Sequence, residues 1–265
     1  MARYTHGHHD SVLRSHRWRT VENSAAYLTG HLESGRSLLD VGCGPGTLTV
    51  DLAQRVAPGR VVGVDRVEAI VEQARADVPG GVANLSFEVG DVYALNFEDG
   101  TFDVVHAHQV LQHLNDPVTA LREMRRVCRP GGVVAVRDAD YGAMTWYPPN
   151  ERLDRWLALY REVAVANGGQ PDAGRCLLHW VHEAGLEEVE ASASAWCFAS
   201  SIEREWWGGL WADRIRRSSL ADHAIESGLA TRSDLEDLAA GWLDWAANPD
   251  AWFAVLHSEV VAAVS

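Results

Sequence analysis

Apolar and polar positions follow one another along residues 35–140 in a way that predicts alternating strands and helices. Short apolar runs of strand length cover residues 37–42, 60–65, 84–89, 101–107 and 132–138. Between them, apolar residues spaced for one helix face predict helices over 46–57, 67–78 and 117–128. This alternation predicts an α/β three-layer sandwich with a mostly parallel sheet.

The chain on either side of this core is patterned differently. Residues 11–19 and 21–32 read as two short helices, and residues 174–184 as a later one. Residues 188–199 read as a strand, and residues 253–260 as a final strand, although their spacing also permits a helix. Helical patterning also marks residues 140–170 and 200–248. We therefore expect an N-terminal helical segment (1–34) and a main domain (35–265) with two helical cap segments at about 140–170 and 200–248.

The loop after the first apolar run has the chemistry of a nucleotide site. Gly42, Gly44 and Gly46 stand at alternate positions just before a predicted helix. They can adopt positive φ and leave the helix amides open to a ligand. Asp65 lies 19 residues beyond Gly46, at the end of the second strand, where its carboxylate can accept hydrogen bonds from ribose hydroxyls. A glycine-rich turn without a ligand is the alternative for this loop taken alone.

The residues around the glycines narrow the choice of nucleotide. Thr47 stands where a dinucleotide fingerprint requires its last glycine, and no lysine is present to hold a polyphosphate. Asp40, just before the loop, would repel a polyphosphate. It suits a ligand with an ammonium group, such as S-adenosylmethionine.

Three further segments give the chain a family resemblance. The strand of residues 86–89 ends in Gly90-Asp91, the strand of residues 101–108 is followed by Gln109, and residues 129–132 (Arg-Pro-Gly-Gly) lead into another strand. Together with the glycine loop they closely resemble the class I S-adenosylmethionine-dependent methyltransferases, in particular the ubiquinone/menaquinone-biosynthesis C-methyltransferase branch, over about residues 35–140. The resemblance implies a Rossmann-like, seven-stranded sheet, S-adenosylmethionine as cofactor, and an N-terminal lid over the site.

The resemblance also implies which residues bind the cofactor. Those at its methionine end are Gly42, Cys43, Gly44 and Gly46, with Asp40 beside them and His108 and Gln109 bordering the transferable methyl. Those at its nucleoside end are Asp65 for the ribose, Arg66 beside the adenine, Asp91 for the adenine amino group, and Val92 and Tyr93 flanking the ring. His113 is included, although in the family this position often packs behind the site.

Methyl transfer from a sulfonium is an in-line displacement that needs alignment, exclusion of water and, for some acceptors, a base. Histidine suits that role, because its pKa lies near neutrality. The catalytic candidates are His6, His9 and His108, and Tyr4 and His8 are candidate substrate contacts in the lid. No Asn-Pro-Pro-Tyr follows the fourth strand, which disfavours amine methylation of DNA or glutamine. The spacing of the histidines in residues 6–10 is not a zinc pattern, so we expect no metal site; a solvated tail is the alternative to a lid there.

Ten of the eleven tryptophans lie after residue 145. They can fill the core of the helical cap or line an acceptor pocket. The candidates for lining such a pocket are Trp146, Tyr147, Trp206, Trp207 and Trp211. Among them we select Trp146, Tyr147 and Trp207 as substrate contacts.

Composition excludes several classes of protein. A net charge of −14 disfavours a nucleic-acid partner. No apolar run is long enough to span a membrane, no signal peptide is recognisable, and the four cysteines form no C-x-x-C pair. We expect a cytoplasmic monomer or homodimer.

The leading hypothesis is therefore transfer of a methyl group to carbon or oxygen of an apolar small molecule, such as an aromatic or isoprenoid metabolite. Two alternatives keep the cofactor motifs. One is an enzyme of this fold that uses the cofactor as a scaffold for a reaction other than methylation. The other is a non-catalytic cofactor-binding partner protein.

Overall fold

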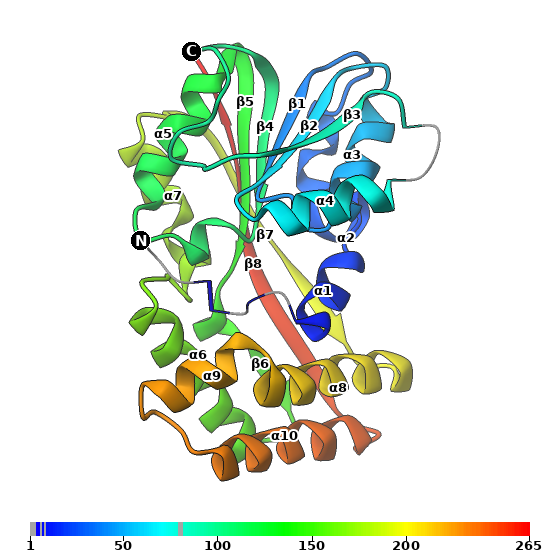
Figure 1. Cartoon of the computed structure of the whole chain (residues 1–265), viewed down its shortest axis with the longest axis vertical. Helices are drawn as coiled ribbons and strands as arrows, with labels where there is room; N and C mark the ends of the chain where they lie inside the picture. Colours follow the sequence, from blue (N-terminus) through cyan, green and yellow to red (C-terminus); the bar gives the residue numbers. More distant parts are fainter. Residues whose placement is uncertain (1–3, 6, 8, 79–81) are drawn as a thin grey trace.

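The computed structural model describes residues 4, 5, 7, 9–78 and 82–265. Its described strands form one mixed, eight-stranded sheet with the order β3-β2-β1-β4-β5-β8, and both β6 and β7 pair with β8 (Figure 1). β1 to β5 are parallel, and β8 is antiparallel to β5, β6 and β7. The strands are β1 (Leu38–Val41), β2 (Val61–Asp65), β3 (Leu85–Val89), β4 (Phe102–His108), β5 (Cys128–Ala139), β6 (Thr145–Tyr147), β7 (Glu188–Phe198) and β8 (Trp252–Ala263).

Helices cover both faces of the sheet, which confirms the predicted sandwich. α2 and α3 pack on one face, and α5 and α7 pack on the other. The α-helices are α1 (Asp10–Arg17), α2 (Val21–Ser24), α3 (Thr47–Val56), α4 (Glu68–Asp77), α5 (Pro117–Val127), α6 (Glu151–Ala166), α7 (Leu177–Glu183), α8 (Ser201–Arg217), α9 (Ser219–Glu226) and α10 (Arg232–Ala247). Short 3-10 helices are η1 (Ala26–His31), η2 (Leu111–His113), η3 (Tyr141–Ala143) and η4 (Ala173–Cys176).

The central strands form where the sequence is continuously apolar, because helices bury them from both sides. All seven residues of β4 are buried. Polar residues fix the helix ends: Asn150 accepts hydrogen bonds from the first amides of α6, and Ser200 and Glu203 form a capping box at the start of α8.

Two predicted segments differ in the structure. The expected helix over residues 21–32 is divided into α2 and η1, because Ala25 has a non-helical backbone (φ −141°). The expected helical segment at 140–170 contains β6 between η3 and α6, an eighth strand where seven were predicted. Pro148 and Pro149 cannot continue a helix, so α6 begins only after Asn150.

The final strand confirms the strand interpretation of residues 253–260 and extends it. The second half of β8 pairs with β5, and its first half leaves the parallel strands and pairs with β6. Figure 1 shows this strand, in red, running from the sheet into the helical end formed by α6, α8, α9 and α10.

Packed aromatic rings fill that helical end. Trp156 of α6 is 1% exposed and meets Trp211 and Trp242 edge to face, at ring-centre distances of 4.6 and 4.7 Å. Phe253 of β8 lies against Trp242 at 5.2 Å. Each pair adds to simple burial, since edge-to-face contacts are favourable for aromatic rings.

We predict that Trp156→Ala lowers the free energy of unfolding by about 3–5 kcal/mol, because the cavity it leaves cannot close among rigid rings. Denaturant unfolding measures this change. Tyr147→Ala is the control, because Tyr147 is 56% exposed, and it should change stability by less than about 0.5 kcal/mol. Equal effects would contradict the packing described here.

Candidate active site

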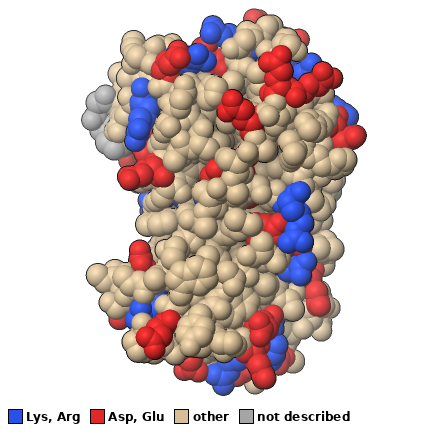
Figure 2. All heavy atoms as spheres, turned by 180° about the vertical axis from the view of Figure 1, so that it is seen from behind, with Lys and Arg blue, Asp and Glu red and all other residues tan. Residues whose placement is uncertain are grey.

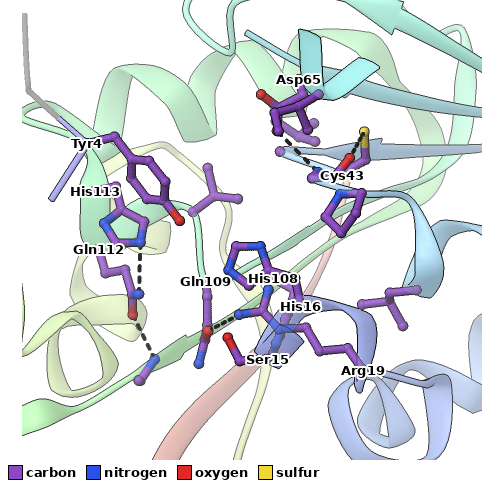
Figure 3. Close-up of a pocket in the computed structure, with 18 of the residues that line it drawn as sticks. Tyr4, Ser15, His16, Arg19, Cys43, Asp65, His108, Gln109, Gln112 and His113 are labelled. Atoms are coloured by element: carbon purple, nitrogen blue, oxygen red, sulfur yellow. Dashed lines mark hydrogen bonds between the residues drawn. The ribbon is translucent and has the colours of Figure 1, made fainter. Parts of the chain in front are cut away.

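One pocket runs from the carboxyl ends of β1, β2 and β4 to the helical end of the molecule. This position, beyond the carboxyl edge of a parallel sheet, is where such folds bind ligands. The pocket takes in residues from the sheet loops, α1, β7, β8 and α8 (Figure 3). The residues that line it include Tyr4, Asp40, Gly42, Cys43, Gly44, Asp65, Arg66, Asp91, Val92, Tyr93, His108, Gln109, His113 and Trp207.

The glycine loop approaches the pocket with bare backbone. Gly42, Gly44 and Gly46 have φ values of +68°, +55° and +80°. A Cβ on Gly42 would lie 2.4 Å from Val110, and one on Gly46 would lie 2.5 Å from Phe87. Only glycine fits these two positions, whereas a side chain on Gly44 would occupy the pocket side of the loop.

Two acidic side chains mark the sheet end of the pocket. Asp65 accepts hydrogen bonds from the amides of Gly44 and Val67, so it ties β2 to the glycine loop. Asp91 accepts from the Tyr93 amide, and the Tyr93 hydroxyl donates to Asn115. Both carboxylates are only partly buried and line the pocket, which leaves lone pairs available to a ligand.

Asp40 is more enclosed than the sequence suggested. It is 3% exposed, and its two oxygens contact Thr49 Oγ1 at 2.6 Å and His106 Nδ1 at 2.8 Å. These two contacts hold the carboxylate below the glycine loop. Because both oxygens already have partners, we expect Asp40 to affect a ligand by electrostatic attraction rather than by a direct hydrogen bond.

A chain of polar contacts crosses the pocket at the end of β4. Gln109 has a φ of +54°, which is unusual for a residue other than glycine and is found at functional sites. Its side chain accepts a hydrogen bond from Arg19 and contacts His257 Nε2 at 2.8 Å. Gln109 thereby joins the segment after α1 to β8.

Two histidines in the pocket, His108 and His113, are electrically neutral at neutral pH. Burial lowers the pKa of His108 well below its usual value, and the positive charges of Arg19 and Arg137 lower it further. Neither ring nitrogen of His108 has a hydrogen-bond partner in the described part of the chain. Burial also lowers the pKa of His113 to about 3, and its ring meets Tyr4 edge to face at 4.8 Å.

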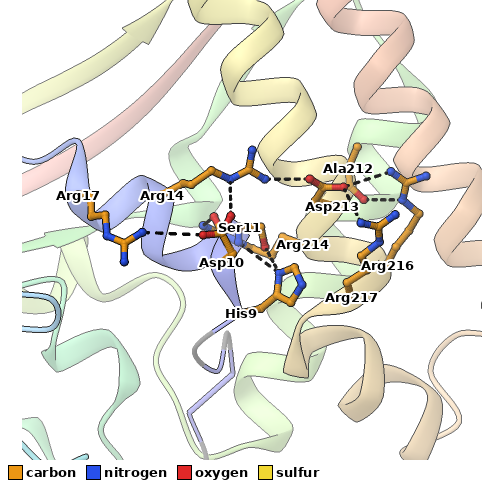
Figure 4. Close-up of polar contacts among 10 residues, drawn as sticks. All are labelled: His9, Asp10, Ser11, Arg14, Arg17, Ala212, Asp213, Arg214, Arg216 and Arg217. Carbon is orange, nitrogen blue, oxygen red and sulfur yellow. Dashed lines mark hydrogen bonds and ion pairs between the residues drawn. The ribbon is translucent and has the colours of Figure 1, made fainter. Parts of the chain in front are cut away.

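α1 covers the pocket and is anchored to α8. Arg14 donates to Asp213 at 2.8 Å (Figure 4). Arg214 donates to the Ser15 hydroxyl at 2.9 Å and to the Ser11 carbonyl at 3.2 Å. On the other side, the His16 ring faces Gly44. This placement fits the predicted lid.

Three of the predicted site residues lie outside the lining of this pocket. His9 does not line the pocket, because its Nδ1 accepts from the Ser11 amide and caps α1. Trp146 and Tyr147 also lie outside it: β6 pairs with β8, Trp146 stacks on Phe253 at 5.6 Å, and Tyr147 faces outward. His6 and His8 lie outside the described residues.

Sequence reasoning missed Arg19 and Arg214. Both line the pocket, yet neither belongs to a motif, because each reaches the site only through the packing of α1 and α8 against the sheet. Trp211, one of the aromatic residues considered for the acceptor pocket, lines it together with Trp207.

We also searched the described residues for metal sites, membrane-spanning helices and charged surface patches. Among the described residues, no group of three His, Cys, Asp or Glu side chains is placed to hold a metal ion. None of the described helices is long and apolar enough to cross a bilayer. Figure 2 shows acidic side chains spread over one face, with arginines in small groups between them.

Comparison with known proteins identifies the family. Residues 32–197 match the family described as "Methyltransferase domain". An uncharacterised methyltransferase of Schizosaccharomyces pombe is 34% identical over 270 residues, which cover 97% of this chain and 95% of that protein. The chain belongs to this methyltransferase family. It is an S-adenosylmethionine-dependent methyltransferase of class I, as the motifs predicted.

Two further comparisons cover the fold and part of the sequence. A methyltransferase of Bacillus halodurans has the same fold, with a TM-score of 0.58 and 20% identity, and the match covers 90% of this chain and 97% of that one. The trans-aconitate 2-methyltransferase of Methylobacterium radiotolerans is 37% identical over 164 residues, or 62% of this chain and 59% of that protein.

We predict that Gly44→Arg abolishes binding of S-adenosylhomocysteine, because the new side chain would fill the pocket beside the glycine loop. Calorimetric titration measures this loss. Gly131→Arg is the matched control, since Gly131 also has positive φ (+77°) but has open space around it, away from the pocket. Unchanged binding by Gly44→Arg would show that the loop is not the cofactor site.

Stability should depend on pH through the buried histidines. His257 is fully buried, and burial beside Arg137 and Arg19 lowers its pKa well below 6.5. The unfolded chain therefore binds this proton near pH 6.5 and the folded chain does not, so stability falls below that pH, by up to about 1.4 kcal/mol per pH unit. Asp138 opposes this loss, because burial raises its pKa to about 7 and its folded form holds a proton that the unfolded form releases.

Because the two groups have opposite effects, His257 is tested by comparing the pH dependence of the unfolding free energy in a variant and in the wild type. His257→Gln should show a shallower loss of unfolding free energy between pH 6.5 and 4.5, measured by denaturant titration. His179→Gln, at an exposed position of α7, is the control. Identical slopes for wild type and His257→Gln would contradict the neutral state of buried His257.

Proposed function

We propose that this methyltransferase transfers a methyl group to carbon or oxygen of a small molecule whose body is apolar or aromatic. The observation that supports the proposal most strongly is the continuity of the pocket. A single cavity joins the glycine loop and acidic residues of the sheet end to the aromatic residues of the helical end. Cofactor and acceptor can therefore meet inside one enclosed space.

The residues at the sheet end fit S-adenosylmethionine. The bare backbone of Gly42 and Gly44 can receive the methionine part, and Asp65 and Asp91 present carboxylates to the ribose and the adenine amino group. Cys43 and Gly46 complete the loop, with Arg66, Val92 and Tyr93 around the adenine. When bound, the cofactor supplies an activated methyl group on a sulfonium.

Arg19 is our candidate for the methionine carboxylate. Gln109 holds its guanidinium over the pocket at the end of β4, next to His108. No described carboxylate forms an ion pair with Arg19, and burial lowers its pKa only to about 10, so it stays protonated. A guanidinium without a carboxylate partner at this place matches the negative end of the cofactor.

The acceptor would lie between the cofactor and the aromatic wall. Tyr141, Met144 and Trp207 line that end of the pocket and come from η3, the loop before β6, and α8. Rigid aromatic and thioether side chains bind apolar ligands through contact area and exclude water from the reacting atoms.

His108 is our candidate for the group that accepts a proton from the acceptor. It is neutral, lines the pocket and has no other hydrogen-bond partner among the described side chains. Tyr4 and His113 stand nearby and shape the site. Its lowered pKa makes His108 a weak base, which suits an acceptor that needs little activation. Cytoplasmic location, and the choice between monomer and homodimer, stay predictions.

The first test is calorimetric titration with S-adenosylmethionine and S-adenosylhomocysteine. We expect the wild type to bind both, and Asp65→Ala to bind them at least about tenfold more weakly, because it loses the ribose contact and the anchor of Gly44. Asp77→Ala, an exposed position of α4, is the matched control. Binding that survives Asp65→Ala would refute the proposed cofactor geometry.

Turnover with methyl-labelled cofactor then separates the proposed activity from its rivals. Label that appears in an acceptor supports methylation. An acceptor that is converted without receiving label would indicate the scaffold role of the cofactor. Binding without any turnover across acceptors would favour the non-catalytic partner protein.

A further inference from the structure

The helical end of the pocket contains a buried positive charge that methyl transfer itself does not require. Arg214 of α8 lines the pocket beside Trp207 and Trp211 and is only 4% exposed. Its guanidinium carbon lies 4.5 Å from the centre of the Trp211 ring. The cation therefore rests against an aromatic face, which fixes its orientation toward the cavity.

Most of the hydrogen-bonding capacity of this guanidinium is unused. Nη2 donates to the Ser15 hydroxyl and the Ser11 carbonyl, both in α1. Nε is buried and has no hydrogen-bond partner within the described chain. The neighbouring carboxylate, Asp213, does not serve Arg214, since it contacts Arg14, Arg216 and Arg217 instead (Figure 4).

No described acidic group balances the charge of Arg214. The acids that line the pocket, Asp40, Asp65 and Asp91, belong to β1, β2 and the loop after β3, at the opposite end. Around Arg214 the pocket offers the hydroxyls of Tyr4 and Tyr141. Burial raises the pKa of Tyr4 to about 12 and that of Tyr141 above its usual value, so both stay protonated and neutral.

An uncompensated charge inside a protein is unfavourable, and a ligand of opposite charge with well-placed hydrogen bonds offsets that cost. We propose that Arg214 binds the carboxylate of the methyl acceptor, so that the acceptor is an apolar or aromatic carboxylic acid. This inference rests on the proposed function and narrows its substrate class. The carboxylate would sit against Arg214, and the apolar body would lie along Met144 and Trp207.

The chemistry favours a carboxylate over other anions. A planar carboxylate matches a guanidinium whose remaining nitrogens lie in one plane, and it carries one charge for one cation. A phosphate dianion would bring a second charge, and the described residues at this end provide no second unpaired arginine. Arg19 lies toward the sheet end, where it is assigned to the cofactor.

Matched probes test the charge directly. The wild type, saturated with S-adenosylhomocysteine, is titrated with 2-naphthoate and with 2-naphthamide, which has nearly the same shape but no charge. We expect naphthoate to bind at least about tenfold more tightly, as charge-assisted hydrogen bonds to a buried arginine require. Equal affinity, or binding of neither probe, would overturn the proposal.

Variants then assign the preference to one residue. Arg214→Gln should remove the preference for naphthoate and leave the affinity for S-adenosylhomocysteine unchanged. Arg214→Lys keeps the positive charge and should retain part of the preference for naphthoate. It replaces Arg214→Gln as the test if that variant does not fold. Weaker binding of S-adenosylhomocysteine by Arg214→Gln would mean that the arginine serves the cofactor carboxylate, and would overturn the proposal.

Two control variants distinguish an effect of the Arg214 charge from an effect of the contact between α1 and α8. Ser15→Ala removes the hydroxyl that Arg214 contacts, and Arg14→Gln removes the ion pair to Asp213, while both keep Arg214 itself. Neither should change the ratio of the two affinities by more than about threefold. If either abolishes the naphthoate preference as Arg214→Gln does, the effect comes from α1, and the proposal fails. Because these ratios are measured with S-adenosylhomocysteine already bound, failure here leaves the cofactor assignment intact.

Discussion

The backbone hydrogen bonds of β8 hold the two ends of the pocket at a fixed separation. One half of this strand pairs with β5 in the sheet, and the other half extends beyond β5 to pair with β6. β7 accompanies it along eleven paired positions, from Glu188 opposite Ala263 to Phe198 opposite Phe253. The helical end is therefore joined to the sheet by a continuous ladder. The residues proposed for cofactor and acceptor therefore sit on one frame, as alignment of a displacement reaction requires.

The pocket carries charges of both signs at its sheet end and a positive charge at its helical end. Carboxylates and the Arg19 guanidinium stand at the sheet end, the neutral side chains of His108 and His113 in the middle, and the Arg214 guanidinium at the helical end. A zwitterionic ligand would match the first end, and an anionic ligand would match the second. Because several of these side chains are buried, their charges act more strongly here than at the surface.

The sequence revealed the parts of the protein whose signals are local. Strands buried on both faces leave continuous apolar runs, and the positive φ values of Gly42 and Gly44 need glycine at fixed spacing. Arg19 and Arg214 could not be found this way, because their role depends on how α1 and α8 pack. Trp146, a predicted substrate contact, lies outside the pocket lining for a related reason. The helical pattern of residues 140–170 did not indicate that Pro148 and Pro149 would prevent a helix there. Residues 145–147, just before these prolines, form β6 instead.

The place of β8 in the sheet also sets the order in which the protein can assemble. This strand lies between β5 and β7, although it is the last strand in the sequence. Its contacts with β5 therefore join residues far apart along the chain, and such pairings form slowly. During synthesis, β1 to β5 can associate early, but β7 has no partner in the sheet until residues 252–263 emerge. Until then the edge of β5 stays open, which is the period in which the nascent chain is most exposed to wrong strand pairing.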